Sequence, residues 1–416
     1  MAATGREFFT VKTVSKALTE FRPGHVTAVE TVSLDDAYGR VPDTEIVARE
    51  PLPGFDRSSV DGYAVRARDT FGASESIPAY LRVVGAVRMG ALASDPVGAG
   101  TAVAIPTGGM LPPQADAVVM IEHTAHATVD TIEVVRPVAP GENVVRRDED
   151  AAPGTPLTPR GRPLRPQDVA LLAAAGVLEV SVHARPRVTI LATGDEVDPP
   201  DTSTLGPGHV RDALSTSVGA LVREAGGEPL GGAIVPDDDG ALREALARAV
   251  ALSDAVVICA GSSVGTRDQT AGAVAALPHA ETWCHGLAIK PGKPTLLAHS
   301  DGIPIIGLPG NPRSALVVFR LIGMPLVRRA GGWSVEPVVG TVPATLSRDL
   351  PSAAGRLDVV QVRLDLDAGA GAGVAEPIFG SSALLSVLTD ADGYVIVPED
   401  ANGLSAGEPV DVIPYG

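Results

Sequence analysis

Four short segments of the chain carry the kinds of residue that bind metal ions or anions. The first, Thr193-Gly194-Asp195-Glu196, directly follows the apolar run VTILA. Two adjacent carboxylates at the end of a strand suit Mg²⁺, which takes one or two protein carboxylates and completes its shell with water or phosphate. The segment also fits an ordinary turn followed by a helix cap, and taken alone it favours that turn because Gly-Asp turns are common.

The second segment, GSSVGTRD at residues 261–268, follows the apolar run AVVICA. Its small residues, among them Gly261, Ser263 and Gly265, would let backbone N–H groups approach an anion, as in phosphate-binding loops. Asp268 adds a carboxylate that could contact a metal ion or a hydroxyl group. A loop rich in Gly and Ser is weak evidence unless other groups join it.

The third and fourth segments are rich in proline. Lys290 and Lys293 lie in KPGKP, and two lysines in a stiff loop of so acidic a chain predict a local anion site. The apolar runs on both sides (GLAI and TLLA) argue against a solvated basic turn. In LPGNP, Asn311 can cap a helix with Pro312 at its first position, and Ser314 adds a donor at that helix N-terminus. An ordinary strand-to-helix turn explains Asn and Pro equally well.

Five apolar runs alternate with helical stretches between about residues 184 and 330. The runs are RVTILATG, PLGGAIVP, DAVVICAG, GLAIKPGKPTLLA and IPIIGLPG. Such alternation predicts a doubly wound sheet with a parallel core, in which ligands bind beyond the carboxyl ends of the strands. The four segments would then meet at one edge of one sheet. Their combination of an acid pair with a lysine pair predicts a metal and anion site there.

The flanking parts of the chain have a different character. Residues 8–21 have the spacing of a short opening helix, and residues 51–145 hold short β-type runs separated by Gly and Pro. Within them, PGFDRSSVDGYA carries Asp56 and Asp61, which fit metal or hydrogen-bonding groups as well as simple turn residues. After GGW at residues 331–333 the pattern returns to short strands, which predicts a separate C-terminal β-domain.

Composition narrows the classes of function. The chain has 416 residues and a formal net charge of -17, so its surface repels nucleic acid and anionic membranes. Its two cysteines form no CxxC or disulfide framework, and no apolar run approaches the length of a membrane span. We expect a cytoplasmic, multidomain protein that binds anions only through a local basic pocket, with neither nucleic acid nor membrane as partner.

Taken together, the motifs resemble those of the molybdopterin molybdenumtransferases, the gephyrin E-domain-like proteins. The run PGFDRSSVDGYAV, the loop TGDE, the SVGxxD loop, IKPGKP and LPGNPRSA occur in that family's order and spacing across essentially the whole chain. The resemblance implies a multidomain α/β plus β fold with a central molybdopterin-binding-like three-layer α/β domain. The implied divisions are an N-terminal linker and dimerisation domain at 1–50 and 146–180, an inserted β-rich domain at 51–145, the α/β domain at 181–330, and a β-barrel-like domain at 331–416.

The resemblance also implies a reaction and its participants. The family inserts molybdate into adenylylated molybdopterin, needs a divalent cation, usually Mg²⁺, and releases AMP. It forms homodimers with an active site in a cleft shared between subunits. Molybdopterin adenylyltransferase and apo-molybdoenzymes are the further partners that the resemblance implies.

Residue roles follow from the same resemblance. It implies catalytic roles for Asp61, Thr107, Glu196 and Asp268, and metal ligation by Asp195, Glu196 and Asp268. The implied substrate-binding residues are Asp150, Asp237 or Asp238, Gly261, Ser263, Gly265, Lys290, Lys293, Pro309, Asn311, Pro312, Ser314, Arg356 and Ser381. Among these, Lys290, Lys293, Ser314, Arg356 and Ser381 resemble the molybdate-binding set. Such a set suits a tetrahedral dianion, which wants fixed ammonium, guanidinium and hydroxyl donors.

Five positions depart from the family pattern. They are Arg57 in place of Asn, Ala260 in place of Gly, Ala213 and Leu214 where a polar Ser/Thr-Asn pair is usual, and Ala383 where a basic residue is expected. Because these changes touch nucleotide or pterin contacts, a catalytically drifted paralogue that binds a pterin or nucleotide, or acts as a scaffold, stays an alternative. A related α/β pterin- or nucleotide-binding enzyme with another substrate fits the central domain but not the flanking β-domains.

Overall fold

The α/β part of the chain is built on one six-stranded sheet. In spatial order its strands are β14 (Glu228–Val235), β11 (Arg187–Thr193), β15 (Ala255–Cys259), β19 (Ile303–Leu308), β18 (Leu296–Ser300) and β16 (Ala280–His285). The first four are parallel, and β18 runs antiparallel to both its neighbours. All five residues of β15 are buried, as its unbroken apolar run predicts for a central parallel strand. The predicted doubly wound sheet with a parallel core is confirmed.

Helices cover both faces of this sheet. Helices on one face share a core with one set of alternate side chains of β11, β15 and β19, and helices on the other face share a second core with side chains from the opposite face of the same strands. The first group is α1 (Val14–Glu20), α3 (Leu214–Glu224), α6 (Pro312–Val318) and α7 (Met324–Ala330); the second is α4 (Asp239–Leu252) and α5 (Val264–Ala275). The result is the three-layer α/β arrangement that the sequence predicts.

Two helices differ from the sequence pattern. The opening helix begins only at Val14, after Thr13 caps it by accepting a hydrogen bond from the Lys16 backbone N–H. The long apolar run SALVVFRLIGMPLVRR forms not one helix but α6 and α7, joined by the π-helical turn η4 (Phe319–Gly323). Hydrophobic spacing shows which face is buried but cannot show a local change from α- to π-type hydrogen bonding.

A second six-stranded sheet occupies the region that the sequence predicts to be β-rich. In order its strands are β6 (Ala117–Met120), β3 (Gly62–Val65), β5 (Thr101–Ile105), β4 (Ala79–Ala86), β8 (Thr131–Val134) and β7 (Thr124–His126). All pairings are antiparallel except that between β4 and β5. The 3₁₀ turns η2 (Ala67–Thr70) and η3 (Ile121–His123) lie at the ends of its strands.

Residues before and after this sheet return to one another. Strand β1 (Val29–Ser33) pairs antiparallel with β10 (Glu179–His183), and β2 (Arg57–Ser58) pairs with β9 (Val144–Val145). The turn η1 (Leu34–Asp36) and helix α2 (Pro166–Ala174) pack on the β1–β10 ribbon through a small apolar core. The β-rich sheet is therefore inserted between two strands of one ribbon.

The C-terminal part closes into a barrel. Its strands follow the cycle β22 (Leu357–Asp365), β23 (Gly373–Pro377), β20 (Val342–Leu346), β26 (Pro409–Pro414) and β24 (Gly393–Val397), which pairs back to β22. The two-residue strand β17 (Ile289–Lys290) leaves the α/β region and pairs with β22. Short elements complete the chain: β12 (Val197–Asp198), β13 (Val210–Arg211), β21 (Leu350–Pro351), β25 (Gly403–Leu404) and α8 (Ser386–Thr389).

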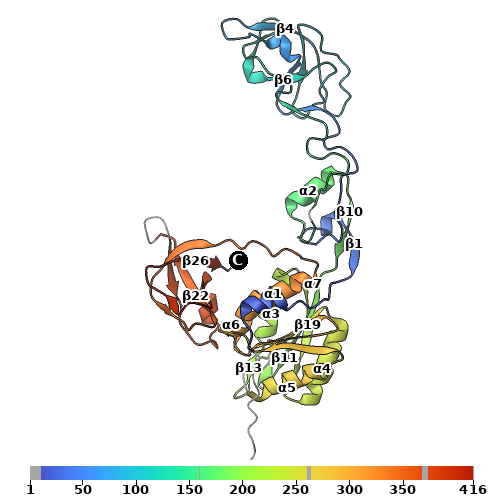
Figure 1. Cartoon of the computed structure of the whole chain (residues 1–416). Coiled ribbons are helices and arrows are strands. Elements are labelled where there is room, and N and C mark those ends of the chain that lie inside the picture. Colours follow the sequence, from blue (N-terminus) through green and yellow to red (C-terminus); the bar gives the residue numbers. More distant parts are fainter. Residues whose placement is uncertain (1–10, 159, 260–263, 368–372, 416) are drawn as a thin grey trace, which may run out of the picture.

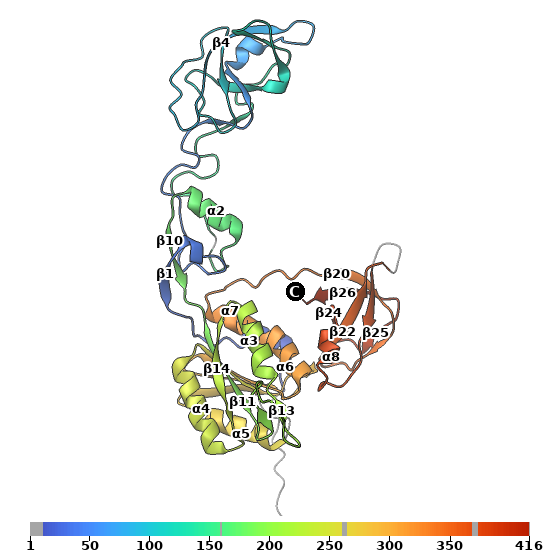
Figure 2. The same ribbon diagram turned by 180° about the vertical axis from the view of Figure 1, so that it is seen from behind.

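The whole molecule is elongated. In this computed structural model, which describes residues 11–158, 160–259, 264–367 and 373–415, the inserted sheet lies at one end and the α/β sheet at the other. The β1–β10 ribbon joins them, and the barrel stands beside the α/β sheet next to α6 (Figures 1 and 2). Among the described residues no helix combines the length and apolarity needed to cross a membrane. The predicted residue limits of the four domains stay predictions.

Candidate functional site

The carboxyl edge of the parallel strands receives three of the four predicted segments. Strand β11 ends at Thr193, the first residue of the TGDE loop, and β19 ends at Leu308, the first residue of LPGNP. The KPGKP loop connects β16 to β18, and the paired residues Leu296 and Gly307 place its end beside the end of β19. The loop after β15 begins in residues 260–263, which lie outside the described residues.

A cavity of about 470 Å³ lies between the KPGKP loop, the start of α6 and the barrel. We call it the cation cavity, because four cationic side chains and one carboxylate line it: Lys290, Lys293, Arg313, Arg356 and Asp358. Of the residues predicted to bind substrate, Pro309, Asn311 and Ser314 also line it. The structure therefore brings most of the predicted anion-binding residues to one hollow.

The KPGKP loop is fixed against helix α6. Gly292 has φ +122°, and a Cβ atom there would lie 2.3 Å from Cγ2 of Val318, so only glycine fits. The hydroxyl of the buried Thr295 donates a hydrogen bond to the Gly292 carbonyl oxygen at 2.7 Å. Both lysines flank this fixed point, and both are exposed residues that line the cation cavity.

Arg356 is held by a buried carboxylate. Its Nε and Nη2 atoms donate to the two oxygens of Asp358 at 2.8 and 3.2 Å, and the Lys290 ammonium lies 3.7 Å from the same carboxylate. The pairing of β17 with β22 sets Lys290 opposite Asp358. Asp358 is 3% exposed, so the two-point contact orients Arg356 strongly.

The serines and Asn311 differ in how they reach the cavity. Ser314 is buried in the first turn of α6, and Ser382 lines the cavity from the barrel side. Ser381, the predicted residue, is exposed beside it, and its Oγ accepts a hydrogen bond from the Ala383 backbone N–H at 3.3 Å. Asn311 occupies the N-cap position of α6, but within the described chain its side chain caps no backbone N–H.

A second cavity, of about 330 Å³, lies on the other side of the LPGNP loop. We call it the carboxylate cavity, because Glu196 and Asp212 line it together with Thr193, Arg211 and Cys259. Thr193 is 5% exposed, and its hydroxyl has no hydrogen-bond partner among the described residues. A buried hydroxyl without a partner is costly, which makes it a free donor or acceptor for a ligand.

The TGDE loop brings like charges together at the edge of this cavity. The backbone N–H of Asp237 donates to Oδ1 of Asp195 at 3.1 Å. Partial burial, then the negative charges of Asp195 and Glu196, raise the pKa of Asp237. Asp238 has a different task, because its carboxylate caps α4 by accepting from the Ala241 N–H at 2.8 Å.

A complete metal site is not formed by protein groups alone. Within the described chain, no three His, Cys, Asp or Glu residues come together closely enough to hold a metal ion. Mg²⁺ needs only one or two protein carboxylates when water and phosphate fill its other positions. The negative charges of Asp195 and Glu196 beside Asp237 fit a divalent cation, since a positive charge there would offset the repulsion that helps to raise the pKa of Asp237.

One loop separates the two cavities. Along it, Pro309, Asn311 and Arg313 line the cation cavity, whereas Gly310 and Pro312 line the carboxylate cavity. The barrel loop repeats this division, with Ser382 on the first side and Ala383 on the second. Two ligands could therefore lie on either side of this loop.

Three predicted site residues lie elsewhere in the chain. Asp61 precedes β3, and its Oδ1 accepts hydrogen bonds from the Thr107 N–H at 2.7 Å and the Thr107 hydroxyl at 3.1 Å. Asp150 is exposed in the connection that leads back from the inserted sheet, where its N–H donates to the Leu52 carbonyl oxygen. Since the inserted sheet and the α/β sheet occupy opposite ends of the molecule (Figure 1), one chain does not bring these residues to either cavity.

The remaining predicted residues belong to the loop after β15. Gly261 and Ser263 lie outside the described residues, as does the departure Ala260. Gly265 and Asp268 belong to the first part of α5, which continues from that loop. Their predicted roles in binding substrate and metal stay predictions.

Three of the five departures from the family pattern lie together. Ala213, Leu214 and Ala383 all line the carboxylate cavity. Arg57 lies in β2, opposite Val145 of β9, at the base of the inserted sheet. The cation cavity keeps every predicted lysine and its arginine.

Sequence reasoning missed four residues of these cavities: Thr193 as an unpartnered hydroxyl, Asp212, Arg313 and Asp358. A signal for Arg313 existed, because it directly follows LPGNP in an acidic chain and lies next to the predicted Ser314. Asp358 could have been noted as a carboxylate two residues after Arg356. Nothing in the sequence marks a threonine at a strand end as lacking a partner.

Comparison with known proteins covers nearly the whole chain. Residues 10–176 match the model of the MoeA N-terminal region (domain I and II), residues 189–329 a probable molybdopterin binding domain, and residues 343–415 the MoeA C-terminal region (domain IV). Molybdopterin molybdenumtransferase 2 of Mycobacterium tuberculosis is 34% identical over 390 residues, 92% of this chain and 94% of that protein. The molybdopterin molybdenumtransferase of Staphylococcus aureus is 31% identical, over 92% of this chain and 90% of its own length. The crystal structure of a molybdopterin biosynthesis MoeA protein from Pyrococcus horikoshii OT3 superposes with a TM-score of 0.82 at 32% identity, over 97% of this chain and all of that one.

Proposed function

The chain belongs to the MoeA family of molybdopterin molybdenumtransferases, a family of transferases of molybdenum cofactor biosynthesis, and on that premise we propose that it inserts molybdate into adenylylated molybdopterin with Mg²⁺-dependent release of AMP. One observation carries the proposal. Two cavities of opposite chemistry share the LPGNP loop as a common wall, one lined by four cations and the other by carboxylates. A reaction between an oxyanion and a metal-bound nucleotide needs two such compartments side by side.

The cation cavity is the proposed molybdate site. Molybdate is a tetrahedral dianion, and Lys290 and Lys293 would supply point charges while Arg356 supplies an oriented fork. The buried hydroxyl of Ser314 adds a short neutral donor at the base of the cavity. Because the KPGKP loop is closed on itself by the bond from Thr295 to Gly292, little ordering is needed when the anion enters.

The carboxylate cavity is the proposed site of the adenylate and its cation. Asp195 and Glu196 would hold Mg²⁺, with Asp237 next to them and Asp268 as a further predicted ligand. When bound, the ion would neutralise charge on the phosphate oxygens of the adenylate. The orphan hydroxyl of Thr193 would then contact the substrate or a water of the ion's shell.

We further propose that the active form is a homodimer in the cytoplasm. Asp61 and Thr107 form a rigid hydrogen-bonded pair far from the cavities of their own chain. A second copy of the chain could bring the same pair, with Asp150, to the cleft. Size-exclusion chromatography with light scattering tests the oligomer directly, and a monomer at working concentration would overturn this part of the proposal.

The reaction itself is tested by incubating the purified protein with adenylylated molybdopterin, molybdate and Mg²⁺. We expect AMP release that depends on both molybdate and Mg²⁺, and activation of an apo-molybdoenzyme by the product. Reactions that omit molybdate or add a chelator serve as controls. Tight binding of the pterin nucleotide without AMP release would overturn the transferase proposal.

That outcome would support the second candidate, a drifted paralogue that binds a pterin or nucleotide. A specific observation favours it: Ala213, Leu214 and Ala383 give the carboxylate cavity an apolar stretch where the family pattern has polar or basic residues. The intact cation cavity favours the active enzyme, because a binding protein has no need for four cations placed for a free dianion.

A further inference from the structure

Arg313 is a buried cation without a carboxylate partner. It is 9% exposed, and among the described residues it forms no ion pair. Its Nε donates to Oε1 of Gln361, and its Nη1 donates to the carbonyl oxygen of Gly380 at 3.1 Å. Both acceptors are neutral, so the positive charge is desolvated but not compensated.

The position of Arg313 suggests why an uncompensated buried charge is present here. It lies on the first turn of α6, between Pro312 of the carboxylate cavity and Ser314 of the cation cavity. Arg313 itself lines the cation cavity together with Lys290, Lys293 and Arg356. Its Nη2 has no hydrogen-bond partner in the described part of the chain. Asp358, the one carboxylate among the described residues that line the cavity, is already shared by Arg356 and Lys290.

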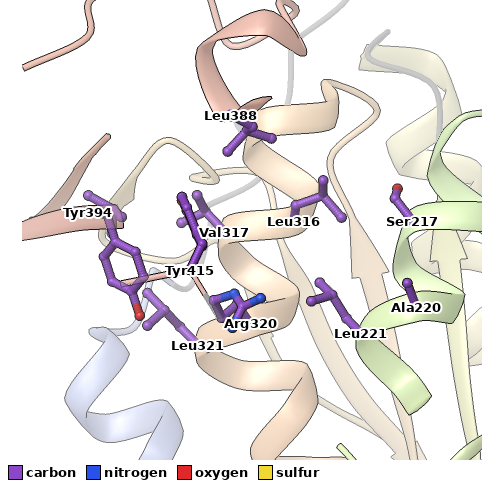
Figure 3. A pocket seen from close by; sticks show the side chains of 11 residues that line it. Ser217, Ala220, Leu221, Leu316, Val317, Arg320, Leu321, Leu388, Tyr394 and Tyr415 are labelled. Carbon is purple, nitrogen blue, oxygen red and sulfur yellow. The ribbon is translucent and has the colours of Figure 1, made fainter. Parts of the chain in front are cut away.

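A series of contacts from the barrel holds the Arg313 guanidinium in place. Gln361 is fully buried, and its Nε2 donates to the Tyr415 hydroxyl at 3.2 Å. Tyr415 lies 5.5 Å from Tyr394 between ring centroids, and the guanidinium of Arg320 lies 5.4 Å from the centroid of its ring. Figure 3 shows Tyr415, Tyr394 and Arg320 among the residues that line a neighbouring apolar pocket. The fork of Arg313 is thus oriented before any ligand arrives.

We propose that Arg313 is a further anion-binding residue of the cation cavity, and that its free guanidinium edge holds the inner face of a dianionic tetrahedral oxyanion. This inference rests on the proposed function, because it assigns one more residue to the same site. The shared chemistry fits two sources, free molybdate and the phosphate group of the adenylate. With Arg313 included, the cavity carries three positive charges in excess, which suits a dianion better than a monoanion.

The test measures binding of two probes, molybdate and AMP, to the full-length wild type and to Arg313→Gln and Arg313→Lys. We expect Arg313→Gln to weaken one of the two dissociation constants by at least about tenfold, as loss of a charged hydrogen bond does, and Arg313→Lys to be intermediate. Loss for molybdate alone would assign Arg313 to the metal oxyanion, and loss for AMP alone to the phosphate. The control Arg348→Gln removes an exposed barrel arginine paired with Glu376 and should stay within about twofold.

Thermal unfolding without ligand separates binding from a structural role. A merely structural Arg313 would lower the melting temperature on replacement and leave both dissociation constants unchanged, which would overturn the inference. We expect instead a melting temperature equal to or above that of the wild type, since an uncompensated buried charge is removed. If the wild type shows Arg313-dependent oxyanion binding but no AMP release, the inference stands and the proposed reaction fails. A wild type that binds neither probe would overturn both.

Discussion

The cation cavity and the carboxylate cavity share a wall but are built on opposite principles. In the cation cavity, each arginine is tied to a fixed acceptor: Arg356 to Asp358, and Arg313 to Gln361. In the carboxylate cavity, the hydroxyl of Thr193 has no partner among the described residues. At the edge of that cavity, partial burial and then the negative charges of Asp195 and Glu196 raise the pKa of Asp237. The side chains of the cation cavity are thus ordered before a ligand binds. The carboxylate cavity instead holds an unpaired hydroxyl, with repelling carboxylates at its edge, and a bound ligand or cation would make both less unfavourable.

The difference has a consequence for the order of binding. A preorganised cation site should bind an oxyanion in the absence of metal, since its geometry does not depend on a second ligand. The carboxylate cavity should gain affinity for a nucleotide only when a divalent cation is present, because its own charges repel phosphate. Mutations can therefore disrupt one cavity while leaving the other intact.

The largest effect should come from removing both lysines of the KPGKP loop. We predict that Lys290→Ala combined with Lys293→Ala weakens molybdate binding by about a thousandfold, through loss of two charge-assisted contacts. Binding of the pterin nucleotide should change far less, because it depends on the neighbouring cavity. Equilibrium dialysis with each ligand measures both, and Lys16→Ala, an exposed lysine of α1, is the matched control. Equal loss of both ligands would show that the cavities do not divide the substrates.

The KPGKP loop can also be disrupted through its backbone conformation, without removing a charge. Gly292→Ala should lower the free energy of unfolding by about 3 kcal/mol, since the residue has positive φ and its Cβ would overlap Val318. Molybdate binding should fall with it, because both lysines flank this point. Gly272→Ala in α5 is the control, where a Cβ meets nothing within 4 Å and should stabilise by up to about 1 kcal/mol. Urea unfolding compares the two, and equal stabilities would remove Gly292 as the fixed point of the loop.

How far the two cavities could be foreseen from the sequence also differs. The parallel core followed from unbroken apolar runs, and the placing of TGDE and LPGNP followed from the rule that ligands lie at the carboxyl ends of strands. Lys290, Lys293 and Ser314 therefore meet where alternating strand and helix place them. Local pattern and topology suffice for that much.

The other features of the site depend on contacts between residues that are far apart in the sequence, and local sequence patterns do not predict them. Strand β17 has two residues, too few for any periodicity, yet its pairing with β22 sets Lys290 opposite Asp358. In the sequence Arg313 is only a polar residue that follows a helix cap. In the fold, its guanidinium donates hydrogen bonds to Gln361 and Gly380 of the barrel, which the sequence does not predict. That the Thr193 hydroxyl has no partner in the described chain is likewise a property of packing, because residue type does not show whether a threonine hydroxyl is hydrogen-bonded.

That hydroxyl gives the third prediction. Thr193→Val should raise the free energy of unfolding by about 1 kcal/mol without ligands, because it removes a buried polar group that has no partner in the part of the chain that the structure describes. Thr189→Val on the same strand is the matched control and should destabilise by a similar amount, since the Thr189 hydroxyl bonds to that of Ser253. If the Thr193 hydroxyl is unpaired in the folded protein, urea unfolding should show changes in the free energy of unfolding of opposite sign for the two variants. A destabilised Thr193→Val would mean that the hydroxyl is satisfied in the folded protein.

The smallest effect concerns the charge of Asp237. Its pKa is raised above that of an unfolded aspartate, so the folded protein loses stability as pH rises from the unfolded value to the folded one, and the loss is constant above that window. Asp237→Asn should match the wild type in acid and exceed its stability at neutral pH, by less than about 1 kcal/mol because the residue is exposed. Saturating Mg²⁺ should remove the difference, since a bound cation favours the charged carboxylate.

The control is Asp201→Asn, which removes an exposed charge from the loop that follows TGDE. The measurement is urea unfolding across this pH range, with and without Mg²⁺. If Asp237→Asn were less stable than the wild type at neutral pH without Mg²⁺, a favourable contact would hold the carboxylate, and the contrast between an ordered and a strained cavity would fail.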